Sequence, residues 1–129
     1  MFRKFSLILK SKLIITMSIL SKTILLLCVS NFFMLCAWYL HLKWFGDKHW
    51  FIAALISWGI AFVEYNFHIP ANRIGSQALS LPQLQILQIG MSLLLFIPFS
   101  ILVMNKPIKL DYIWATCCII MAAFFIFRK

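Results

Sequence analysis

Apolar residues in this chain come in long runs, without the regular return of polar positions that marks the helices and strands of a soluble domain. Four of the runs are long enough to cross a membrane, since a spanning helix needs about 20 mostly apolar residues to cross about 30 Å of hydrocarbon. The runs cover residues 23–42, 50–67, 83–103 and 110–127. We therefore predict an all-α membrane protein with four transmembrane helices.

The connections between these runs are short and contain residues that end helices. Gly46 lies in the first connection, Pro70 and Gly75 lie in the second, and Pro107 lies in the third. Pro82 is expected in the first turn of the third helix. Because short connections bring successive helices back alongside each other, we expect the four helices to form an antiparallel bundle.

Residues 1–22 are too rich in lysine and arginine to span a membrane, so we treat them as a basic extension of a transmembrane domain over residues 23–129. One interpretation is an interfacial amphipathic helix, because Lys4, Ser11, Ser18 and Lys22 fall on nearly one face. A second interpretation is that translation starts at Met17. A cleaved signal peptide has the least support, since no cleavage site of small residues follows a compact apolar core.

The composition agrees with a membrane protein. Of the 129 residues, 64% are hydrophobic and 12% are charged, which leaves too little polar surface to coat a soluble domain. The net charge of +9 is consistent with contact between the chain and the anionic headgroups of a lipid bilayer. Nucleic-acid binding is not expected, because the basic residues are scattered over both sides of the membrane.

The positions of the basic residues predict the orientation in the membrane. If the N-terminus is cytoplasmic, eight of the 12 lysines and arginines lie on the cytoplasmic side and the other four lie outside. This bias favours a cytoplasmic N-terminus and a cytoplasmic C-terminus. Without residues 1–16 the count becomes four against four, so the bias disappears and dual insertion becomes conceivable.

Four motifs carry a family resemblance. They read SNFFMLCAWYLHLK, ISWGIAFVEYNFHIPANRIGS, QLQILQ and KPIKLDYI, and they lie within residues 21–127. Their order and spacing resemble a family of small four-helix bacterial membrane proteins labelled as drug/metabolite transporter family proteins. That family is similar to the small multidrug resistance proteins in size and helix count. The resemblance implies a multi-pass transporter of small molecules in the bacterial inner membrane.

Glu64 is the candidate for a proton-binding residue. Small multidrug resistance proteins carry their proton-coupling acid in the first helix, and the first predicted helix of this chain has no acid. A helix-packing face of mostly small residues shares a narrow arc of the second helix with Glu64 and comprises Ala53, Ser57, Ala61 and His68. We therefore expect Glu64 in a helix or dimer interface, where burial favours the neutral carboxyl group and could allow reversible protonation.

A structural role for Glu64 is the alternative. Glu64 lies about one turn before the predicted helix end at His68, which is near the headgroups. There it could be paired with Arg73 or hydrogen-bonded to the free amides at the start of the third helix. The residues predicted to form the motif of the following loop are Pro70, Asn72, Arg73 and Gly75.

Three further residues are candidates for substrate contact. Asn31 is the amide in the middle of the first helix, and Gln88 lies with Gln85 and Ser92 on one face of the third. Trp58, within the second helix, could stack on a flat or cationic ligand. Such amides more often form hydrogen bonds between helices, and a tryptophan in this position could equally serve packing.

The sequence gives no basis for an enzyme, a metal site or a cofactor. His41 and His49 flank the first connection without further residues at metal-ligand spacing. We expect a transporter of a small molecule, coupled to protons through Glu64 and acting as a homodimer whose second and third helices line the pathway. The alternative is a non-transporting membrane protein with a structural, lipid-interacting or assembly role.

Overall fold

The computed structural model describes residues 1–128 and contains, within them, four long helices and no strand. Helix α1 comprises Phe2–Trp44, α2 comprises Trp50–Gly75, α3 comprises Leu81–Leu102 and α4 comprises Leu110–Phe127. All four helices are long and apolar enough to cross a membrane. The predicted all-α membrane protein with four spans is confirmed.

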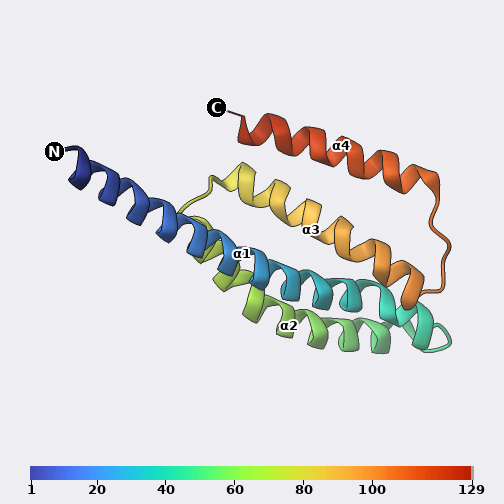
Figure 1. The fold of residues 1–129 in the computed structure, drawn as a ribbon. Helices are drawn as coiled ribbons and strands as arrows, with labels where there is room; N and C mark the ends of the chain where they lie inside the picture. The colour runs from blue at the N-terminus through green and yellow to red at the C-terminus, as the bar shows by residue number, and fades with distance from the viewer. Residues whose placement is uncertain (129) are drawn as a thin grey trace.

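The helices lie side by side in the order α2, α1, α3, α4 (Figure 1). Helix α1 packs against α2 on one side and against α3 on the other, and α4 packs against α3. Successive helices run antiparallel, whereas α1 and α3 run parallel (Figure 1). Because α1 is the central helix, two of its faces are packed against other helices.

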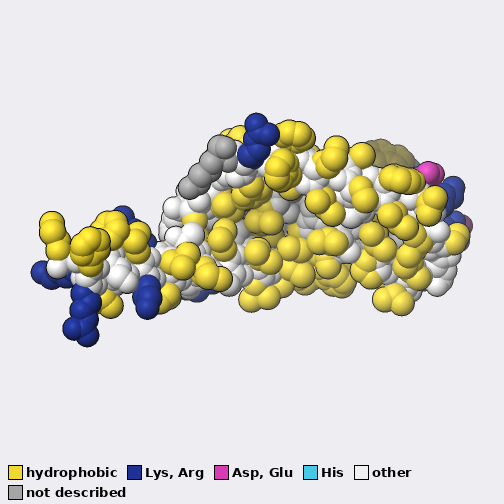
Figure 2. All heavy atoms as spheres, turned by 45° about the horizontal axis from the view of Figure 1, so that its top comes forward, with side chains coloured by type: hydrophobic (Ala, Val, Ile, Leu, Met, Phe, Trp, Pro, Cys, Tyr) yellow, Lys and Arg dark blue, Asp and Glu magenta, His cyan; other side chains and the backbone are white. Residues whose placement is uncertain are grey.

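Helix α1 starts at Phe2, 21 residues before the predicted first span. Its 43 residues extend over about 65 Å, which is about twice the thickness of the hydrocarbon core. Residues 2–18 are exposed and project beyond the other helices with their lysine and arginine side chains (Figures 1 and 2). The basic extension is thus helical and continuous with the first span, and its contact with lipid headgroups stays a prediction.

Helix α2 continues eight residues past the predicted end of the second span. The residues predicted to form a loop motif lie instead in the last turns of this helix: Pro70, Asn72, Arg73 and Gly75. Pro70 cannot donate a backbone hydrogen bond, but membrane helices tolerate proline where neighbouring groups compensate. Packing compensates here, since Ala71 is fully buried and Gly75 lies against Thr23 of α1 and Leu84 of α3.

One side of α2 faces the central helix. The buried residues of α2 are Ala53, Glu64, Ala71 and Gly75, and spacings of 11, 7 and 4 residues place them on one side of a helix. This side faces α1, the helix that packs along α2. It also contains the other residues predicted for the packing face, Ser57, Ala61 and His68, which are half-buried.

Hydrophobic side chains predominate on the face of the four-helix region that Figure 2 shows. The large apolar side chains that are more than half exposed include Leu55, Phe62, Leu94 and Phe124, one or more from each of α2, α3 and α4. Helix α4 has no buried residue at all. Such an exterior suits lipid and would be unfavourable in water. The chain is therefore a multi-pass membrane protein.

Candidate functional site

Glu64 lies in the interface between α2 and α1 and is 3% exposed. It is 11 residues before the end of α2 at Gly75, which corresponds to about 16 Å along the helix. The structural interpretation of Glu64 placed the end of the helix at His68 and the carboxyl group near the headgroups. Because α2 continues to Gly75, Glu64 lies further from the end of its helix than the sequence suggested.

Glu64 belongs to a continuous chain of hydrogen-bonding side chains. Ser30 of α1 donates its hydroxyl to Glu64 Oε1 at 2.6 Å. His68 Nδ1, one turn along α2, lies 3.3 Å from the same oxygen and 3.2 Å from Ser30 Oγ. After a further turn, Asn72 Nδ2 lies 3.0 Å from His68 Nε2. These four residues, which we call the polar chain, extend about two turns along the interface.

The contacts of the polar chain indicate where its protons lie. If the Asn72 amide donates to His68 Nε2, the imidazole proton is on Nδ1 and points to Glu64 Oε1. The ionised carboxylate then accepts from both Ser30 and His68. The polar chain thus places two titratable side chains, Glu64 and His68, in one hydrogen-bonding network.

The partners of Glu64 differ from those suggested by the sequence. Arg73 was one expected partner, and the free amides at the start of the third helix were the other. Arg73 is exposed on α2, and within residues 1–128 the side chains that bond to the Glu64 carboxyl group are Ser30 and His68. Glu64 is thus held by the central helix and by its own helix.

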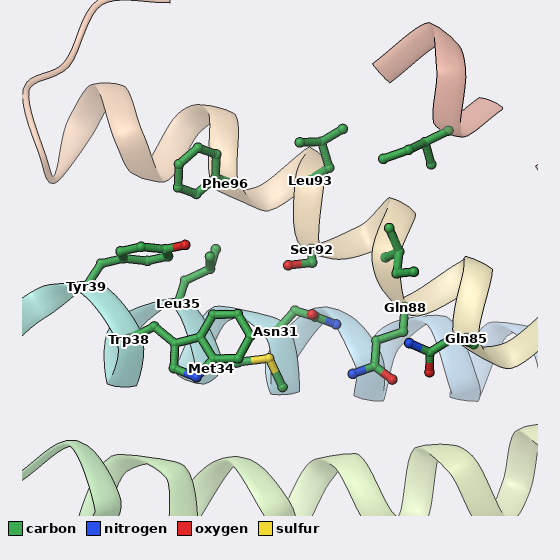
Figure 3. Close-up of a pocket in the computed structure, with 12 residues that line it drawn as sticks. Asn31, Met34, Leu35, Trp38, Tyr39, Gln85, Gln88, Ser92, Leu93 and Phe96 are labelled. Atoms are coloured by element: carbon green, nitrogen blue, oxygen red, sulfur yellow. The ribbon is translucent and has the colours of Figure 1, made fainter. Parts of the chain in front are cut away.

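A groove of about 420 Å³ lies between α1 and α3 (Figure 3). Its polar lining includes Asn31 from α1 and Gln85, Gln88 and Ser92 from α3. Its aromatic lining consists of Trp38, Tyr39 and Phe96. No lysine, arginine, aspartate or glutamate is among the described residues that line it. This α1–α3 groove differs from the expected pathway, which was to lie between the second and third helices.

Asn31, one of the residues that line this groove, carries an unpaired acceptor. The side chain is fully buried, and its Nδ2 donates to the Leu27 carbonyl at 2.8 Å. That bond orients the amide, because only the NH₂ group can face a carbonyl oxygen. The other end of the amide, Oδ1, has no hydrogen-bond partner within residues 1–128. Buried acceptors without a partner are rare, since leaving one unpaired costs about 1–3 kcal/mol.

Ser30 and Asn31 connect the polar chain with the groove. They are consecutive residues of α1, so their side chains leave the helix about 100° apart. Ser30 bonds to Glu64 of α2, whereas Asn31 lines the groove beside Ser92 and Gln88 of α3 (Figure 3). Helix α1 thus contributes Ser30 to the polar chain and Asn31 to the groove, on adjoining faces.

A second cavity, of about 350 Å³, lies near the connection between α2 and α3. Its lining includes His68 and Asn72 of the polar chain, the charged Arg73, and Gln85 and Gln88, which also line the α1–α3 groove. We call it the turn cavity. At the other end of the helices, Trp38 lines both the groove and a cavity beside the connection between α1 and α2. The groove is thus flanked by a cavity at each end.

The structure does not bring all predicted site residues together. Asn31 and Gln88 meet in the groove, and Glu64 lies on the other side of α1. Trp58, which we expected to contact a ligand, is 68% exposed and lines none of the cavities described above. The tryptophan that lines the groove is Trp38.

Ser30 was missed as a site residue, whereas His68 was predicted for the packing face and Asn72 for the loop motif. Ser30 is a single serine in an apolar run and gives no signal in the sequence. Asn72 was assigned to a loop, although Glu64, His68 and Asn72 recur every four residues, which is the spacing of one helix face. Asn72 would have been placed on the same helix face as Glu64 and His68 if α2 had been extended past Pro70.

A protein-family model described as "Putative member of DMT superfamily (DUF486)" matches residues 23–127. No curated protein and no solved structure matches the chain. The matched region contains the polar chain, the α1–α3 groove and all of α2, α3 and α4. The chain therefore belongs to this family, whose description refers to the drug/metabolite transporter (DMT) superfamily.

Proposed function

We propose that this protein transports a small molecule across the bacterial inner membrane and that protonation of Glu64 drives the transport. Membership of the family supports the transport function. The observation that carries proton coupling is the polar chain, in which Glu64 and His68 share Ser30 deep in an apolar interface. Ionisable groups within membrane spans are costly to bury, so a pair of them points to a functional site.

His68 provides a route for protons between water and Glu64. His68 and Asn72 both line the turn cavity, the ring's Nε2 contacts Asn72, and its Nδ1 faces Glu64 Oε1. When Asn72 turns its amide oxygen toward the ring, Nε2 can accept a proton from the cavity. Nδ1 then passes its own proton to Glu64, and the imidazole is neutral again.

Movement of α1 couples this protonation to the groove. An ionised carboxylate is a stronger acceptor than a neutral carboxyl group, so protonation of Glu64 weakens its 2.6 Å bond from Ser30. Helix α1 can then shift against α2, and Asn31 shifts with it in the groove. Proton binding thus biases the groove between two conformations that open to opposite sides, as alternating access requires.

The pathway is completed by a second copy of the chain and by the orientation of the helices. Four helices in a row leave the α1–α3 groove open at one side, and a homodimer would cover it. With both termini cytoplasmic, the turn cavity opens to the cytoplasm and the cavity beside the α1–α2 connection opens outside. The mass of the protein in lipid nanodiscs tests the dimer, and a monomeric mass throughout would refute it.

Charge movement in liposomes tests the transport function. Wild type and Glu64→Gln are reconstituted and recorded on a solid-supported membrane with a panel of small metabolites and cations, with and without a pH gradient. Asn66→Ala is a matched control, because Asn66 lies on the exposed side of the same helical turn. We expect substrate-dependent currents from the wild type and the control that the Glu64→Gln variant loses.

Two outcomes would contradict the proposal. Equal currents from wild type and Glu64→Gln would remove Glu64 from the coupling mechanism while keeping transport. Silence of well-folded wild-type protein with every compound would refute transport and favour a structural or lipid-interacting role.

A further inference from the structure

We infer that the α1–α3 groove binds an uncharged small molecule that donates an N–H or O–H hydrogen bond to Asn31 Oδ1. The inference rests on the proposed transport function and names the class of substrate. Its first support is the fully buried Asn31 side chain, whose Oδ1 has no partner within the described residues. The bond from Nδ2 to the Leu27 carbonyl prevents the amide from turning to offer a donor instead.

The absence of charge in the described groove lining argues for an uncharged ligand. A cation or anion that leaves water for a groove between apolar helices needs an opposite charge there. Glu64 belongs to α2, on the other side of α1 from the groove, and its carboxyl group is already bonded to Ser30 and His68. Glu64 is therefore not positioned to neutralise a cation in the groove.

The remaining lining favours a ligand with a flat ring. Tyr39 and Phe96 lie with ring centroids 5.6 Å apart at one end of the groove, and Trp38 lies beside them. Aromatic faces and edges of this kind pack well against a planar ring. Gln88 and Ser92 lie near Asn31 in Figure 3. Each side chain can donate and accept a hydrogen bond, so they suit a ligand with an acceptor near its donor.

The size of the groove agrees with such a ligand. Its volume of about 420 Å³ falls within the range of about 300–1,000 Å³ that is usual for small-molecule sites. The competing occupant is a lipid acyl chain, which could fill the space but has no donor for Asn31. An experiment can therefore distinguish the two occupants by asking whether binding depends on a hydrogen-bond donor in the ligand.

Three fluorinated probes distinguish these occupants. Fluoroindole is flat, uncharged and has one N–H donor, N-methylfluoroindole lacks the donor, and fluorobenzylammonium is a cation. Binding of each to the full chain in nanodiscs is followed by fluorine NMR, with empty nanodiscs to correct for partition into lipid. No pH gradient is present, so binding is measured independently of transport.

The matched variants are Asn31→Leu and Asn66→Leu. Both asparagines donate their Nδ2 to the carbonyl four residues earlier at 2.8 Å, but Asn66 is exposed and does not line the groove. We expect Asn31→Leu to weaken fluoroindole binding about tenfold, as the loss of one buried hydrogen bond implies, and Asn66→Leu to leave it unchanged. Fluorobenzylammonium should bind more weakly than fluoroindole.

The probes test the inference even if Asn31→Leu does not fold, because fluoroindole should bind wild type about tenfold more tightly than N-methylfluoroindole. Equal binding of these two probes would overturn the inference and favour an acyl chain. Tighter binding of the cation would overturn the uncharged class. Either result could occur while the currents still depend on Glu64, so the inference can fail without the transport function failing.

Discussion

Replacing Gly75 by alanine should destabilise the junction at which α2 meets α1 and α3. A Cβ atom on Gly75 would lie 2.6 Å from Leu84 Cδ2 and 2.8 Å from Thr23 Cγ2, well inside normal contact distance. The end of the Leu84 side chain is flexible and can turn away. Thr23 is fully buried, and its hydroxyl donates to the Ile19 carbonyl at 2.8 Å, so its methyl group cannot easily move.

The size of the effect follows from two opposing contributions. Forcing a methyl group into a packed interface typically costs about 1–3 kcal/mol. Alanine is a better helix former than glycine by about 1 kcal/mol, and Gly75 gains only part of this because it is the last residue of α2. We therefore expect the free energy of unfolding to fall by about 1–2 kcal/mol.

Unfolding in mixed micelles with increasing dodecyl sulfate measures this free energy. Gly59→Ala is the matched control on the same helix, since no atom lies within 4 Å of its added Cβ. That variant should be as stable as the wild type or slightly more stable. Adding Thr23→Ser to Gly75→Ala removes the obstructing methyl group and keeps the hydroxyl, so it should recover part of the lost stability.

Two results would refute this reasoning. If Gly75→Ala unfolds at the same dodecyl sulfate concentration as Gly59→Ala, the three helices are not in close contact at Gly75. If Thr23→Ser destabilises the Gly75→Ala variant as much as it destabilises the wild type, Thr23 is not the residue that resists the new methyl group.

Three further predictions follow from the same contacts. Ser30→Ala removes the hydroxyl that donates to Glu64, and the free energy of unfolding in the same micelles should fall by about 1–3 kcal/mol. Deleting residues 2–16, all exposed, should leave that free energy unchanged, and a loss would show that they pack on the bundle. Asn72→Ala should slow the currents driven by a pH gradient without abolishing them, because Glu64 and His68 stay in contact; unchanged currents would exclude the route through Asn72.

The four helices could be predicted from the sequence because each apolar run is as long as the membrane is thick. The start of α3 was also predictable, since Pro82 lies in its first turn and the Ser80 N–H donates to Gln83 Oε1 at 2.9 Å. The end of α2 was not, because Pro70 locally favours a helix end. Burial of Ala71 and Gly75 against neighbouring helices outweighs that preference, and such contacts depend on the tertiary structure.

The candidate site could be predicted from the sequence only in part, for the same reason. Glu64 stood out because an acid among small apolar residues is unusual at any position in a span. Its partner Ser30 comes from another helix, and which face of α1 meets α2 depends on how the helices are ordered in space. The row arrangement also explains why Glu64 and Gln88, both predicted as site residues, lie on opposite sides of α1.

Helix α4 packs on the outer side of α3, and none of its residues is fully buried. Only a few of its side chains are half-buried, so its separation from α3 would change the solvation of few groups. Local opening of the native state should therefore begin at α4, at a free energy well below that of global unfolding. The polar chain would survive such opening intact, and the groove would lose only Ile119 from its lining. The buried residues of the described chain thus all lie in the first three helices, and α4 is the helix that we expect to separate first.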